Sequence, residues 1–201
     1  MRSIIDTTFG EVLTMTWPTL FIAVVLVVTI RIGYLLKHKE EFVFYKEMLY
    51  LCFMLYILCL FQIVTAEDLN ATNGNNFQLF NEIFRYQFGG RLFFKNIVGN
   101  VLMFVPYGFF ASLYVDIKHP LKAFALIFAA SLSIEITQLA IGRVFDVDDI
   151  LLNVTGGMIG FIIYYLLDKI SNLIPILKKE IVLNIITIIV LVSSVAFIIW
   201  R

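Results

Sequence analysis

The sequence predicts an all-α protein, a polytopic membrane helical bundle of about six transmembrane helices. The chain of 201 residues is 61% hydrophobic and only 15% charged, with a mean hydropathy of +0.93. A soluble domain would contain about 25% charged residues. The chain also contains six apolar runs of the length that crosses a bilayer, about 17–25 residues. These runs are residues 14–36, 48–66, 97–115, 121–141, 150–168 and 181–200.

The chain is expected to form a single membrane domain over residues 1–201. The connections between the apolar runs are short, except for the segment of about 67–96. No internal repeat and no linker between two domains is visible. The net charge is zero, which argues against a nucleic acid as partner.

The distribution of lysine and arginine predicts the orientation, because short cytoplasmic loops carry an excess of positive charge. The loops after the first, third and fifth runs carry Lys37, Lys39, Lys46, Lys118, Lys122, Lys169, Lys178 and Lys179. The short loop 142–149 carries one basic residue, Arg143. We therefore expect the lysine-bearing loops to be cytoplasmic. Both termini, the 67–96 segment and the 142–149 loop are then external.

Glu135 is the most informative residue, because it lies within the apolar run 121–141. An ionisable group at the bilayer centre costs roughly 2.5–3.5 kcal/mol, so its default interpretation is a functional site with a nearby partner. The chain otherwise avoids charge within its apolar runs and concentrates its polar chemistry here. The polar residues that follow Glu135 are Gln138, Arg143, Asp146, Asp148, Asp149 and Asn153.

Three pairs of polar residues are expected to meet in one layer at the external side. The members of each pair are three or four residues apart, so they share a helix face. The pairs are Asn96 with Asn100, Glu135 with Gln138, and Asp149 with Asn153. Under the predicted orientation, all three lie near the external ends of their helices. The sequence therefore predicts a ligand-binding polar cluster beneath the outer surface.

Charge matching gives this cluster two interpretations. Arg143 is the expected ionic partner of Glu135, because a planar guanidinium can hold a carboxylate with two parallel hydrogen bonds. The loop also carries three aspartates, whose negative charge exceeds what one arginine can neutralise. Some of them are expected to cap the N-terminus of the next helix, where negative charge is favourable. The others are expected to face solvent, a cation or a polar ligand. The alternative is structural: polar networks also hold membrane helices together, at roughly 0.6–2 kcal/mol per hydrogen bond.

Two further features concern structure more than chemistry. Residues 77–94 are unusually aromatic, which favours either an interfacial element that covers the cluster or a loop that packs on the bundle. Gly156, Gly157 and Gly160 favour close helix packing, because small residues let membrane helices approach each other.

These motifs resemble those of the VanZ-like family of bacterial membrane proteins. The first block is Asn96-x3-Asn100-x3-Phe104-x-Pro106-x-Gly108. The second runs from Glu135 through Gln138, Arg143, Asp146, Asp148, Asp149 and Asn153 to the three glycines. The resemblance covers about residues 77–167. It implies a multi-pass protein of the bacterial plasma membrane, related to one that lowers susceptibility to teicoplanin, a lipoglycopeptide that acts at the cell wall.

The favoured hypothesis is a VanZ-like membrane protein, non-enzymatic or of an activity not yet defined, whose external pocket binds a lipid headgroup, a cell-wall precursor or the lipoglycopeptide itself. No cofactor and no resident metal is expected, and no catalytic residue can be assigned. One alternative is an enzyme acting on a lipid phosphate, with Mg²⁺ or Mn²⁺ held by the carboxylates and Arg143 on the phosphate. Another is a proton-coupled transporter of a lipid-linked substrate, in which Glu135 titrates.

Overall fold

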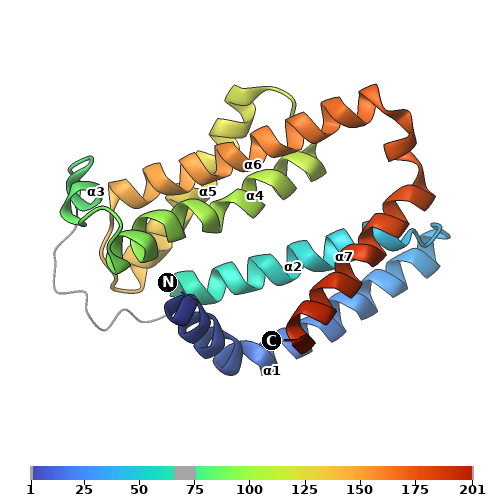
Figure 1. Ribbon diagram of the computed structural model, residues 1–201, viewed down its shortest axis with the longest axis horizontal. Coiled ribbons are helices and arrows are strands. Elements are labelled where there is room, and N and C mark those ends of the chain that lie inside the picture. Colours follow the sequence, from blue (N-terminus) through green and yellow to red (C-terminus); the bar gives the residue numbers. More distant parts are fainter. Residues whose placement is uncertain (1, 66–75, 201) are drawn as a thin grey trace. The chain divides into compact units, whose positions relative to one another are not determined.

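The computed structural model describes residues 2–65 and 76–200, and these residues are almost entirely helical (Figure 1). The all-α fold class is therefore confirmed. The helices are α1 (Arg2–His38), α2 (Phe44–Thr65), α3 (Asn81–Arg85), α4 (Gly99–Val115), α5 (Pro120–Ala140), α6 (Val147–Leu173) and α7 (Glu180–Trp200). A π-helical turn, η1 (Phe93–Val98), precedes α4, and a 3₁₀ turn, η2 (Pro175–Lys178), precedes α7.

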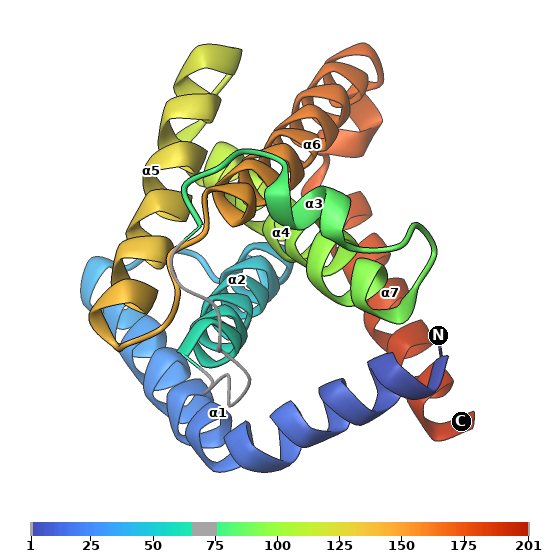
Figure 2. The same cartoon turned by 90° about the vertical axis from the view of Figure 1, so that its left-hand side faces the viewer.

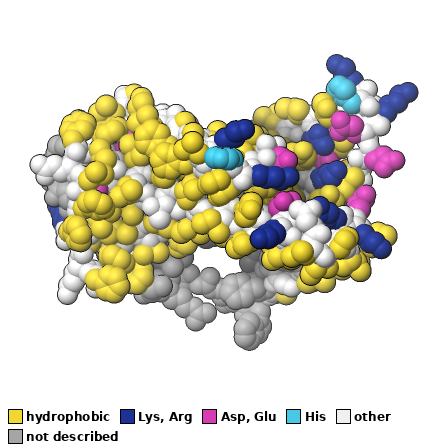
Figure 3. Space-filling model, turned by 90° about the horizontal axis from the view of Figure 1, so that it is seen from above, with side chains coloured by type: hydrophobic (Ala, Val, Ile, Leu, Met, Phe, Trp, Pro, Cys, Tyr) yellow, Lys and Arg dark blue, Asp and Glu magenta, His cyan; other side chains and the backbone are white. Residues whose placement is uncertain are grey.

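Five described helical stretches are long and apolar enough to cross a membrane. They are Trp17–His38, Phe44–Val64, Phe93–Val115, Pro120–Ala140 and Val147–Leu173. The sixth predicted run coincides with α7, in which the apolar stretch found is the shorter Glu180–Ser194. Apolar side chains cover most of the described surface visible in Figure 3. Such a surface is what a bilayer requires of the helices that it surrounds.

The chain divides into two compact units: residues 1–12 with 60–166, and residues 13–59 with 167–201. Each is described by itself below, and the single membrane domain stays a prediction. Residues 66–75, which include most of the polar start of the long 67–96 segment, lie outside the described residues.

In the first unit, α4 and α6 pack backbone against backbone, and they run side by side in Figures 1 and 2. A methyl group added at Gly156 would overlap the carbonyl of Val101, and one added at Gly160 would overlap the carbonyl of Val105. Gly108 of α4 meets the backbone of α6 in the same way. Small residues are needed here because no side chain fits between the two helices.

The far end of α4 is tied to α6 by a polar contact at Asp116, just beyond the span Phe93–Val115. Asp116 ends α4 in the left-handed conformation, and its carboxylate accepts a hydrogen bond of 2.8 Å from the Tyr164 hydroxyl. The Lys118 ammonium lies 3.2 Å from the same carboxylate oxygen. The Tyr164 hydroxyl and then Lys118 stabilise the ionised form, so they lower the pKa of Asp116 below its usual range.

The other end of this unit carries the candidate site. There α4 begins, α5 ends and α6 begins, and the segment that contains α3 lies beside the starts of α4 and α6 (Figure 1). Asn76 pairs with the loop before α6, since its N–H donates to the Phe145 carbonyl at 2.8 Å and its carbonyl accepts from the Val147 N–H at 3.2 Å. These bonds hold the start of the segment 76–85 against the loop before α6.

Candidate functional site

Glu135 lies in the last third of α5 and is turned into the protein. Its side chain is only 1% exposed, and its Oε2 accepts a hydrogen bond of 3.0 Å from the Asp146 backbone N–H. Glu135 therefore does not face lipid, and the loop between α5 and α6 folds back over it. A buried carboxyl group needs such a donor, because leaving it unbonded in an apolar layer is costly.

Asn100 and Asp149 join the start of α4 to the start of α6. The Asn100 Nδ2 donates a hydrogen bond of 2.5 Å to the Asp149 Oδ1. The Asp149 carboxylate is also within electrostatic range of Glu135, Asp146, Asp148 and Arg143. These residues come from the start of α4, the end of α5, the loop after α5 and the start of α6, and they thus share one region.

Asn153 continues the same face of α6 one turn further into the helix. Its Nδ2 donates to the Ser131 Oγ of α5 at 3.2 Å, and Ser131 lies one turn before Glu135 on α5. Both side chains are buried, and the Asn153 Oδ1 is buried without a hydrogen-bond partner. An unsatisfied buried acceptor is uncommon, and it marks the place where a donor from a ligand or a water would be stabilised.

Asp146 and Asp148 hold the segment that follows Asn76. The Asp146 Oδ1 accepts from the Asn76 Nδ2 and from the Asp148 backbone N–H, both at 2.8 Å. The Asp148 Oδ1 accepts from the Phe80 N–H at 2.5 Å, and its Oδ2 accepts from the Ile83 N–H at 3.4 Å. Both carboxylates therefore satisfy backbone donors at the start of α6 and around α3.

The fully buried Asp148 gives a first prediction. Asp148→Ala is expected to destabilise the first unit by about 2 kcal/mol, because the Phe80 and Ile83 backbone N–H groups lose a charged acceptor. The measurement is reversible unfolding in mixed micelles followed by circular dichroism. Asp168→Ala is a suitable control, since Asp168 lies near the C-terminal end of the same helix. An equal loss for both variants would mean that the Phe80 and Ile83 contacts contribute nothing.

Gln138 and Arg143 both reach the end of α2. The Arg143 Nη1 donates to the Val64 carbonyl at 2.7 Å, and the Gln138 Nε2 donates to the same oxygen at 3.4 Å. Val64 is one of the last residues of α2, so its carbonyl has no partner within the helix. The two side chains therefore cap α2 with the loop after α5, and the predicted pairing of Arg143 with Glu135 stays a prediction.

The structure thus pairs Asn100 with Asp149 and Glu135 with the Asp146 backbone, and it places Asn153 against Ser131, one turn before Glu135 on α5. Asn96 lies in η1, and its side chain takes part in none of these contacts. Within residues 2–65 and 76–200, no group of three or more His, Cys, Asp and Glu side chains is arranged to hold a metal ion.

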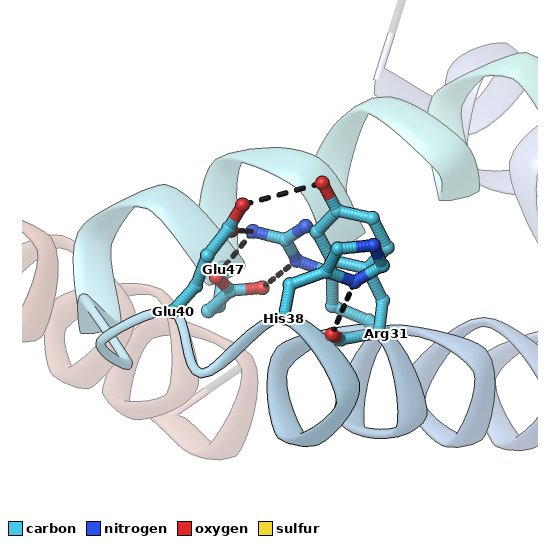
Figure 4. Close-up of polar contacts among 5 residues, drawn as sticks. Arg31, His38, Glu40 and Glu47 are labelled. Carbon is cyan, nitrogen blue, oxygen red and sulfur yellow. Dashed lines mark hydrogen bonds and ion pairs between the residues drawn. The ribbon is translucent and has the colours of Figure 1, made fainter.

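A second intramembrane charge, Arg31, was not predicted as a site from the sequence, where the intramembrane charge was expected only around Glu135. Arg31 lies in the span Trp17–His38 and forms a two-bond pair with Glu47 of α2 in the second unit (Figure 4). The bonds are 2.8 Å from Nε to Oε2 and 3.0 Å from Nη2 to Oε1. The guanidinium also stacks over the rings of Tyr34 and Tyr50. The signal was present, because Arg31 falls within the apolar run 14–36 and intramembrane arginines have partners.

The fold and the site define the class of this protein: a multi-pass helical membrane protein with polar chemistry gathered at one end of α4, α5 and α6. The model of the VanZ/LLP1 family matches residues 47–168, more than half of the chain. The chain belongs to the VanZ/LLP1 family, as the resemblance of its motifs indicated. The match begins within α2, earlier than the region 77–167 that contains those motifs.

One relative is Protein VanZ of Enterococcus faecium, which is 33% identical over 81 residues. The match covers 39% of this chain and 50% of that protein, so the chain spans about half the length of the relative. No solved structure matches the chain.

Proposed function

We propose that this VanZ-like protein works at the bacterial plasma membrane, where the polar cluster of α4, α5 and α6 binds a polar ligand at the outer leaflet. Its effect on the cell is a lower susceptibility to teicoplanin and related lipoglycopeptides. The ligand is a lipid headgroup, a cell-wall precursor or the lipoglycopeptide. In this proposal both termini and the 142–149 loop are external.

The observation that carries the proposal is the burial of Glu135 within a membrane-spanning helix, hydrogen-bonded to the loop that covers it. A purely structural network would be expected to satisfy its own polar atoms. Here the Asn153 Oδ1 lacks a partner one turn below Glu135. A ligand group that donates hydrogen bonds would complete this set of carboxyl and amide oxygens.

The ligand chemistry that fits is a group with several N–H or O–H donors. The carboxylates of Glu135 and Asp149 and the amide oxygen of Asn153 are all acceptors. Asp146 and Asp148 already accept backbone N–H groups, so they position the loop and the α3 segment. Hydroxyl-rich and amine-bearing headgroups and precursors meet this requirement.

The test is expression in a susceptible Gram-positive host, with teicoplanin inhibition measured for the wild type and for Glu135→Gln. The wild type is expected to raise the inhibitory concentration. Glu135→Gln is expected to lose most of this protection, because the amide keeps the shape but replaces one acceptor oxygen by an N–H donor. Membrane abundance is compared for each variant, so that a loss of protein is not mistaken for a loss of function.

A matched control is Ser133→Ala. Ser133 lies two residues before Glu135 on the same helix and is exposed, and its hydroxyl donates to the Ala129 carbonyl of its own helix. It should retain the wild-type inhibitory concentration. If Glu135→Gln protected as well as Ser133→Ala at equal abundance, the proposed role of the cluster would be untenable.

A further inference from the structure

The segment of residues 77–95, here called the aromatic–basic segment, is held at the end of the first unit by both of its ends. At its start, Asn76 is bonded to Phe145 and Val147 beside the first residue of α6. At its end, Phe93 begins η1, the opening turn of the span Phe93–Val115. Each anchor is the first turn of a membrane-spanning helix, so the segment between them is confined to the membrane–water boundary.

Internal contacts give the aromatic–basic segment a defined shape. Asp148 accepts hydrogen bonds from Phe80 and Ile83, which fixes the start of α3. Gly89 has a φ of +77°, a value that favours glycine, and the Gly90 N–H donates to the Gln87 carbonyl at 2.9 Å. This turn brings the Phe88 ring back to the Phe93 ring, with 5.0 Å between their centres.

Despite this order, large apolar side chains of the segment are left uncovered by the protein. Phe84 is 82% exposed and Phe88 is 88% exposed, and Phe77 and Leu92 are also exposed. Phenyl rings at the boundary of a bilayer are stabilised when they enter the acyl region below the headgroups. The segment is too short to span, because α3 has only five residues.

Basic side chains accompany the exposed rings. The segment contains Arg85, Arg91 and Lys95 but one acidic residue, Glu82, so its net charge is +2 in a chain whose net charge is zero. The side chains of Arg91 and Lys95 are exposed and lie on either side of Leu92 and Phe93. This combination is complementary to a lipid that has apolar chains and a negative phosphate.

We propose that the aromatic–basic segment is a docking surface for anionic phospholipids, in which Phe84 and Phe88 enter the acyl region while Arg91 and Lys95 bind headgroup phosphates. The segment is bonded to the loop that covers Glu135 through Asn76 and to the start of α6 through Asp148. A lipid bound here therefore lies next to the polar cluster of α4, α5 and α6. This inference does not depend on the ligand of that cluster.

The experiment uses the full chain in proteoliposomes of equal phosphatidylcholine and phosphatidylglycerol. Trp17→Phe and Trp200→Phe remove the native indoles, and Phe88→Trp adds one reporter. Bromine, a short-range quencher of indole fluorescence, is placed in the acyl chains of one lipid at a time. Phe84→Trp in the same background is a second reporter, so that the result does not depend on one position.

The expected result is a blue-shifted emission at both positions that either brominated lipid quenches, with several-fold stronger quenching by brominated phosphatidylglycerol. Each basic residue near an anionic surface adds to the local enrichment of that lipid. Arg91→Gln combined with Lys95→Gln is expected to make the two lipids equal quenchers. Lys118→Gln combined with Lys122→Gln is the matched control at the opposite end of α4 and α5, and it should keep the preference.

Two outcomes would overturn the proposal. Emission typical of an indole in water, unquenched by both lipids, would mean that the rings do not meet acyl chains. Equal quenching by both lipids in the parent protein, unchanged by Arg91→Gln and Lys95→Gln, would mean that the basic residues do not select anionic headgroups. Folding of each variant is checked by its helical circular dichroism and its elution as a monodisperse species.

Discussion

Replacing Gly156 by alanine is expected to destabilise the protein by about 3 kcal/mol. The added methyl group would overlap the Val101 carbonyl, which is backbone and cannot rotate away. Helices α4 and α6 must then separate, and the close contact between them is lost. Overpacking of this kind typically costs about 1–3 kcal/mol and sometimes more. The free energy of unfolding in mixed micelles measures this loss.

The control for this prediction is Gly33→Ala. Gly33 lies inside α1, and a methyl group there would meet nothing within 4 Å. Because alanine is the better helix former, this variant should be stabilised by about 0.5–1 kcal/mol. A similar gain for Gly156→Ala would show that α4 and α6 do not approach as closely as described.

Replacing Glu47 by alanine is expected to cost about 3 kcal/mol in the second unit. Arg31 would then lie in an apolar span without its two-bond carboxylate partner. Breaking a buried ion pair by removing one member costs 3–5 kcal/mol. The lower end applies because the Arg31 side chain is still 29% exposed. Unfolding in the same micelles measures the difference.

A double-mutant cycle separates the pair from other effects. Glu47→Ala combined with Arg31→Met should cost less than the sum of the two single variants, by about 1–3 kcal/mol. Glu41→Ala, at an exposed position in the turn before α2, should stay within about 0.5 kcal/mol of the wild type. Strict additivity of the two single variants would mean that the pair contributes no coupling.

Composition and run length were sufficient for the fold class. Six apolar runs in a chain with few charges leave no other arrangement, because only helices satisfy every backbone group within a lipid-embedded segment. Five runs correspond closely to spanning helices of the structure. Their boundaries moved by several residues, mainly at the ends where charged residues such as Glu47 continue a helix beyond its apolar part.

Helical spacing also predicted which polar residues share a helix face. It grouped Asp149 with Asn153, and the structure directs the first to Asn100 of α4 and the second to Ser131 of α5. Ser131 was overlooked, since a serine in an apolar run gives no signal of its own. Its burial against Asn153 depends on how α5 packs on α6, and a one-dimensional pattern does not contain that information.

The sequence by itself determined a helical membrane protein of the VanZ/LLP1 family, and it located Glu135 as a charge that needs a partner. Only the tertiary structure decided which donors meet which carboxylates. Asp146 binds Asn76, Asp148 binds the backbone around α3, and Arg31 binds Glu47. The physical reason is that the hydrophobic effect is non-directional, so the number of apolar residues in a run is enough to predict that the run is buried. A hydrogen bond requires two particular atoms within about 3 Å, and chain folding alone brings them together.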